Sequence, residues 1–65
     1  MKIGEVWMNK STKRTFRITN IELDPMANDY DVTILYLGHS KDEFTESTWN
    51  RIGFIKHFER ITNDF

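Results

Sequence analysis

Residues 30–37 form the longest apolar stretch of the chain and predict a β-strand. Most of them are β-branched or aromatic, and such residues are enriched in strands. Side chains alternate between the two faces of a strand, so that one face carries Tyr30, Val32, Ile34 and Tyr36. The other face begins polar and becomes apolar toward Leu37. We therefore expect a central strand that enters from the surface and is then covered on both sides.

A change of phase within residues 14–23 predicts a bent second strand. Its apolar residues fall into two pairs of opposite parity, Phe16 and Ile18 followed by Ile21 and Leu23. A bulge near Thr19 and Asn20 would return all four side chains to one core, because one extra residue shifts the alternation. Small closed barrels use such bends to turn their corners.

Shorter strands and turns account for most of the remaining chain. Residues 3–8 predict the first strand, and the polar residues 9–13 predict the turn after it. Residues 24–29 contain proline and asparagine and predict the second loop. Residues 43–47 alternate and predict a short fourth strand, with Phe44 as its apolar member.

A short helix is expected before the last strand. Apolar residues recur at a spacing of three, at Trp49, Ile52 and Ile55. This spacing is typical of one helical face, and Ser47 or Thr48 can cap the start of a helix. We expect the helix to run from about Thr48 to His57. Residues 58–62 then alternate as a closing strand.

Four strands, a short helix and a fifth strand follow the order of SH3-like barrels. The sequences Gly-Glu-Val-Trp at 4–7, Thr-Phe-Arg-Ile at 15–18 and the ending at 54–61 resemble small SH3-like or Tudor-like domains, a pattern often seen in short proteins of bacteriophages and their bacterial hosts. The resemblance covers most of the chain but consists of core positions, so it implies a fold and no functional residue. We expect one mainly β domain, residues 1–65, forming a five-stranded SH3-like barrel with one short helix before the last strand.

The composition limits how this domain is stabilised and where it resides. The chain of 65 residues has no cysteine, which excludes disulfides, thiolate metal sites and a cysteine nucleophile. A domain of this size buries only roughly 60% of the surface of its unfolded chain. No apolar run approaches the roughly 20 residues of a membrane span, and no apolar stretch follows Lys2 as in a signal peptide. We therefore expect a soluble, cytoplasmic protein that does not bind membranes.

Charge is unevenly distributed along the chain, although the net charge is only −1. Residues 1–20 hold five basic residues and one acidic residue, whereas residues 21–48 hold seven acidic residues and one basic residue. The simpler interpretation is that these two segments lie beside each other and attract. The alternative is a basic first hairpin that meets phosphate or an acidic partner.

No pattern of residues indicates catalysis. His39 with Asp42 or Glu43 could offer two ligands in one turn. A zinc site usually needs at least three protein ligands in compatible geometry, so a solvated loop is the favoured interpretation. The serines and histidines fall in no nucleophile motif. The three glycines stand alone, so there is no phosphate-binding loop. We expect no enzyme activity, no cofactor and no metal.

A protein-binding role is favoured, because small barrels bind peptides or partner surfaces with exposed aromatic residues. The candidate residues are Trp7, Tyr30, Tyr36 and Trp49. In so small a core, at least two of these four should be packing residues. Trp7 is expected to be exposed, because its face of the first strand also carries Glu5.

Two other roles remain open. Nucleic acid would bind the basic first hairpin, with Trp7 stacking on bases, and the candidate residues are Lys10, Lys13, Arg14 and Arg17. The sequence pI near 6.0 argues against this role, because nucleic-acid-binding domains often exceed 9. The small core also favours a homo-oligomer, in which an unpaired first or last strand extends the sheet of a neighbour.

Overall fold

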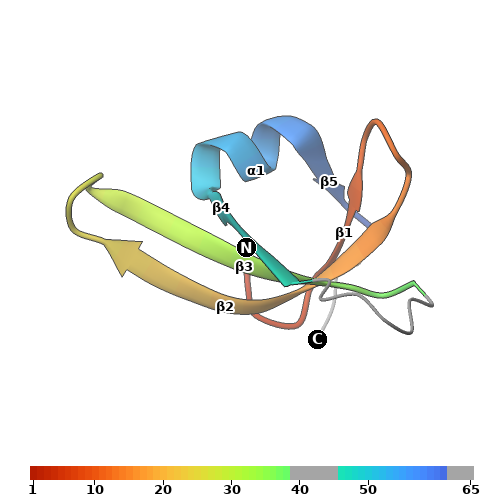
Figure 1. Ribbon diagram of the computed structural model, residues 1–65, viewed down its shortest axis with the longest axis horizontal. Helices are drawn as coiled ribbons and strands as arrows, with labels where there is room; N and C mark the ends of the chain where they lie inside the picture. The colour runs from red at the N-terminus through yellow and green to blue at the C-terminus, as the bar shows by residue number, and fades with distance from the viewer. Residues whose placement is uncertain (39–45, 62–65) are drawn as a thin grey trace.

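A computed structural model of the chain describes residues 1–38 and 46–61. In these ranges, five antiparallel strands form one sheet in the order β4-β3-β2-β1-β5, and one short helix precedes the last strand (Figure 1). The elements are β1 (Val6–Asn9), β2 (Thr15–Asp24), β3 (Asp29–Tyr36), β4 (Glu46–Asn50), α1 (Arg51–His57) and β5 (Phe58–Arg60). The predicted mainly β fold and its order of elements are confirmed. The sheet is open, with β4 and β5 at its two edges.

The bulge predicted in the second strand is confirmed. The pairing of β2 with β3 runs from Ile18 opposite Ile34 directly to Asn20 opposite Thr33, so Thr19 is the extra residue. The Thr19 hydroxyl donates to the carbonyl oxygen of Thr33 at 3.3 Å. The register then places four cross-strand pairs on one face of the sheet: Phe16 with Tyr36, Ile18 with Ile34, Ile21 with Val32, and Leu23 with Tyr30.

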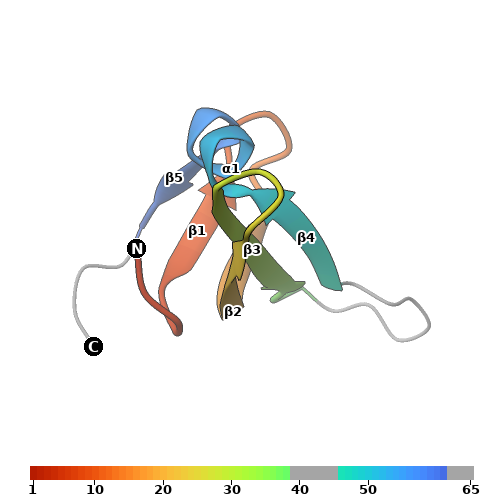
Figure 2. The same cartoon turned by 90° about the vertical axis from the view of Figure 1, so that its left-hand side faces the viewer.

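The helix α1 lies over this face of the sheet and completes the core (Figure 2). The buried hydrophobic residues are Trp7, Ile18, Val32, Ile34, Phe54 and Phe58. The Phe54 ring stacks on Phe58 with centroids 4.6 Å apart and touches Trp7 at 4.8 Å. Full burial of one such side chain stabilises the fold by roughly 1.5–3 kcal/mol.

The position of the longest apolar strand differs from the prediction. β2, rather than β3, stands at the middle of the strand order. Leu35 and Leu37 are each about two-fifths exposed, so the second face of β3 is not covered within the described residues. The apolar residues on that face therefore give a partly exposed surface instead of a second core.

The predicted start of the helix is wrong, and its predicted end at His57 is confirmed. β4 extends to Asn50, and α1 begins at Arg51. The cap is Asn50, whose side-chain oxygen accepts a hydrogen bond from the Ile52 N–H at 3.0 Å. Trp49 belongs to β4, where it lies opposite Val32. The predicted strand at 43–47, including Phe44, lies largely outside the described residues.

Candidate interaction surfaces

Trp7 is buried, with 9% of its surface exposed, so the expectation that it is exposed is wrong. The physical reason is Glu5, which points into the structure beside it. Oε1 of Glu5 accepts hydrogen bonds from the Trp7 indole Nε1 at 3.2 Å and from the backbone N–H of Lys2 at 3.0 Å. Oε2 pairs with the Arg60 guanidinium at 3.1 Å. A charged residue and a tryptophan therefore share an inner face of the sheet.

The electrostatic state of Glu5 follows from these contacts. Burial raises the pKa of the carboxyl, because it disfavours the charged form. The hydrogen bonds from Lys2, Trp7 and Arg60 favour the charged form and outweigh burial, so the pKa of Glu5 lies below its ordinary value. The carboxylate is thus ionised near neutral pH and accepts hydrogen bonds from three parts of the chain.

The four candidate aromatic residues do not form one patch. Tyr30 is 47% exposed at the end of the β2–β3 hairpin, whereas Tyr36 and Trp49 are half-buried elsewhere. No ring contact in the described part of the chain joins any two of the four. These four residues therefore do not form an aromatic cage, in which several rings converge on one cationic group.

The β2–β3 hairpin projects past α1 at one end of the molecule (Figure 1), and large apolar residues of this end are exposed. Four large residues there are about half exposed or more, and we call them the apolar end: Leu23 (58%), Met26 (94%), Tyr30 (47%) and Ile52 (63%). Leu23 and Tyr30 lie opposite each other in the ladder. The bulge turns this pair toward the core face, but the pair stands beyond the helix, so the predicted burial of Leu23 is wrong.

An ion pair ties the hairpin to the start of the helix. Nε of Arg51 lies 2.8 Å from Oδ1 of Asp29. The hydrogen bond from Arg51, aided by the Tyr30 N–H, holds the pKa of Asp29 below its ordinary value. This contact places Ile52, the next residue of α1, at the same end of the molecule as Tyr30. Carboxylates surround this end: Glu22, Asp24, Asp29 and Asp31.

The first turn is held in shape by Asn9. Its side-chain oxygen accepts from the N–H groups of Ser11 at 2.9 Å and Thr12 at 3.0 Å. Lys13 adopts a left-handed conformation with φ 65°, and its N–H donates to the Asn9 carbonyl. The turn thus presents its basic side chains from a hydrogen-bonded backbone.

The first turn also contacts the C-terminal end of α1, which the sequence did not predict. The Lys10 N–H donates to the His57 carbonyl at 2.9 Å, and Lys10 Nζ donates to the Lys56 carbonyl at 3.3 Å. These contacts bring Lys56 beside the turn. We call the four exposed cations assembled here the basic surface: Lys10, Lys13, Arg14 and Lys56.

Arg17, the fourth predicted nucleic-acid-binding residue, lies apart from this surface. It occupies the outer face of the sheet, opposite Val6 on β1 and Leu35 on β3. Its guanidinium donates to the carbonyl oxygen of Gly4 at 3.2 Å. The predicted basic hairpin therefore separates into a turn on one side and Arg17 on another.

No group of three or more potential metal ligands occurs within residues 1–38 and 46–61. His39, Asp42 and Glu43, the ligands considered from the sequence, lie outside those ranges. His57 is exposed at the end of α1. The only helix in the described ranges, α1, is too short to cross a membrane.

Comparison with known proteins gives no relative from which a role can be transferred. No protein-family model, no curated protein and no solved structure matches this chain.

Proposed function

We propose that this protein is a small, non-enzymatic interaction module that binds a protein partner through the apolar end. The observation that carries the proposal is the exposure of four large apolar residues at this end, Leu23, Met26, Tyr30 and Ile52. Leu23 and Tyr30 lie opposite each other in the ladder, and the Asp29–Arg51 ion pair brings the start of α1 to the same end. Exposed apolar surface that is larger than single scattered residues marks protein interaction sites. Tyr30 is suited to anchor such a contact, because tyrosine offers a large rigid ring with a polar tip.

The charge around the apolar end indicates the chemistry of the partner. Four carboxylates lie on this part of the hairpin, and Arg51 pairs with one of them, Asp29. Complementary charge steers association and excludes partners of like charge. The partner surface is therefore apolar at its centre and basic at its rim.

Affinity capture with matched variants tests this proposal. The tagged protein is used to capture binding proteins from the cells that make it, in parallel with a Tyr30→Ala/Ile52→Ser variant. A Leu35→Ser/Ile61→Ser variant is the control, because it removes two exposed apolar groups from the outer face. A protein retained by the wild type and the control but lost from the first variant supports the proposal. Capture of no protein above background, or equal capture by all three, contradicts it.

Self-association is a second candidate function, favoured by the outer face of the sheet. Partly exposed apolar residues lie there on β1, on β3 and just after β3 and β5, with β2 between β1 and β3: Val6, Met8, Leu35, Leu37 and Ile61. An antiparallel sheet with a solvated face normally carries polar residues on it. Sedimentation of the wild type and of the Leu35→Ser/Ile61→Ser variant tests this role, and a wild-type mass near 7.8 kDa at high concentration contradicts it.

We also propose that the domain is a small SH3-like barrel and that it originates in a phage or mobile element. The strand order β5-β1-β2-β3-β4, the bulge at Thr19 and the helix between β4 and β5 support a small SH3-like barrel. The resemblance to short phage proteins supports an origin in a phage or mobile element, a cytoplasmic location and a host protein as the partner.

A further inference from the structure

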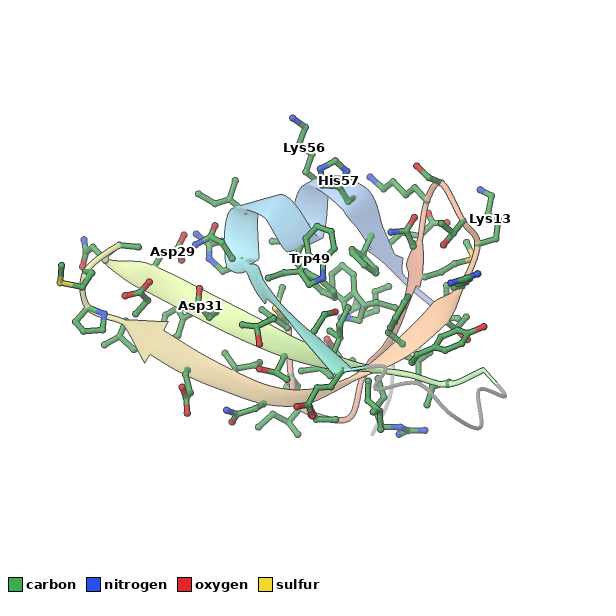
Figure 3. The ribbon with its side chains drawn as sticks, in the orientation of Figure 1. Lys13, Asp29, Asp31, Trp49, Lys56 and His57 are labelled. Carbon is green, nitrogen blue, oxygen red and sulfur yellow. The ribbon has the colours of Figure 1, made fainter. Side chains whose placement is uncertain are left out.

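No carboxylate of residues 1–38 and 46–61 forms an ion pair with the basic surface. The ion pairs in the described ranges are Arg51 with Asp29 and Arg60 with Glu5, and neither involves the basic surface. The acidic residues of the hairpin lie at the opposite end from the first turn, as Figure 3 shows for Asp29 and Asp31 relative to Lys13, and Lys56 projects from α1 between the two ends. The low pI of the whole chain therefore hides a local excess of positive charge.

The two remaining carboxylates near this end also face away from the basic surface. Glu46 lies opposite Leu35, and Glu59 lies opposite Met8. Leu35 and Met8 belong to the outer face of the sheet, whereas Trp49, opposite Val32, belongs to the inner face. An anion that approaches the turn thus meets four cations and no facing carboxylate among the described residues.

Aromatic rings lie alongside these cations. The Trp49 ring, half-buried, lies 6.0 Å from the His57 ring and 5.2 Å from the Phe58 ring. The row continues through Phe58 and Phe16, at 5.5 Å, to Tyr36, at 5.4 Å. Its two ends are half-buried: Trp49, next to the end of α1, and Tyr36, next to the first turn.

Tyr36 is fixed in place by its neighbours. The Arg14 guanidinium lies over its ring, 5.6 Å from the centroid. Gly38 lies so close to the ring that a Cβ at this position would collide with it. Arg14 is thus exposed beside an aromatic ring, and a guanidinium in such a place can stack with a further planar group.

We infer that the basic surface, together with Trp49 and the Arg14–Tyr36 pair, binds single-stranded nucleic acid. The cations pair with successive phosphates, and the indole and guanidinium planes stack with bases. Duplexes are disfavoured, because their bases are already stacked and unavailable to the rings. This site is separate from the apolar end. The inference does not depend on the proposed protein partner.

Tryptophan fluorescence tests the inference, because Trp7 is buried and Trp49 is the accessible reporter. We expect an oligothymidylate of about 12 nucleotides to quench the fluorescence of the wild type. This length lies within the range that small domains binding single-stranded nucleic acid usually cover. Quenching should be lost in Trp49→Phe, while binding measured by anisotropy of a labelled oligonucleotide is weakened but retained. Four phosphate contacts predict a salt dependence of log K with a slope of about −3.

Charge variants provide the second readout. Lys13→Gln/Lys56→Gln removes two cations whose side chains make no contact in the described structure, and should halve the slope and weaken binding at low salt. Lys2→Gln/Arg17→Gln changes the net charge equally on other surfaces and should bind like the wild type. The inference is overturned if the two double variants lose affinity equally, if polyglutamate or a duplex of the same length binds as tightly as the oligothymidylate, or if no binding occurs at low salt.

Discussion

The Glu5 carboxylate and the Trp7 indole are joined by a buried hydrogen bond, with Oε1 3.2 Å from Nε1. Glu5 is the one charged residue that is buried in the described part of the chain, and three donors surround it. Its partners come from the N-terminal segment, from β1 and from β5. The carboxylate thus links three parts of the chain. It adds to the packing of a small core that consists of six buried apolar side chains.

Removal of this carboxylate should destabilise the fold. In Glu5→Ala, the Trp7 indole N–H and the Lys2 N–H lose their acceptor, and an unsatisfied buried donor costs about 1–3 kcal/mol. Glu5→Gln keeps an acceptor for the indole and should cost less. Urea denaturation followed by circular dichroism measures both changes. Equal stability of Glu5→Ala and the wild type would contradict the role assigned to this carboxylate.

The stability should also depend on pH with a definite sign. The pKa values of Glu5 and Asp29 are lower in the folded state than their ordinary values. As the pH is lowered, these two carboxyls therefore bind protons in the unfolded chain before they do so in the folded chain. The stabilisation is full above the ordinary carboxyl pKa range and is lost as the pH falls through the folded pKa values. The urea concentration at the unfolding midpoint should therefore decrease when the pH is lowered below about 4. In Glu5→Gln this fall should be smaller, and an unchanged pH profile in that variant would count against the assignment.

The start of α1 gives a third prediction. Asn50 caps the helix by accepting from the Ile52 N–H, so Asn50→Ala should lower the free energy of unfolding by about 1 kcal/mol. Asn50→Ser restores a capping oxygen and should recover most of the loss. Aspartate is a poor choice of rescue, because position 50 lies opposite Asp31. Similar unfolding midpoints for the alanine and serine variants would show that Asn50 does not cap the helix.

The helix provides a matched pair of core and surface substitutions. Phe54 is fully buried against Trp7 and Phe58, and Phe54→Ala should cost about 3–5 kcal/mol. Small domains have little more stability than this, so the variant should be largely unfolded at 25 °C. Ile55→Ala alters the adjacent exposed residue and should change stability by no more than about 0.5 kcal/mol. Native-like circular dichroism of Phe54→Ala would contradict the packing described here.

Local patterns in the sequence predicted the parts of the fold that depend on neighbouring residues. The phase change between Ile18 and Ile21 required an extra residue, and the structure places it at Thr19. The order of the elements along the chain and the end of the helix at His57 follow from alternation and spacing in the same way. The start of the helix was missed, because Trp49 fits both a helical spacing and the inner face of β4.

Contacts between distant residues were not predictable from these patterns. Glu5 was taken to mark an outward face, but its partner Arg60 is 55 positions away. Lys56 joins the basic surface only through Lys10, 46 positions earlier. The exposure of Leu23 and Tyr30 depends on how far the hairpin extends beyond α1. Alternation within one strand predicts the face on which a side chain lies, but not whether a helix covers that part of the face.

Site-specific photo-crosslinking tests the central claim, that a protein partner binds at the apolar end. Tyr30 is replaced by benzoylphenylalanine, and the protein is irradiated inside the cells that make it. The same replacement at Leu35, an exposed apolar residue of the outer face, is the control. The account predicts a discrete protein adduct from position 30 that is absent from position 35. No adduct at position 30, or the same adduct at both positions, would contradict it.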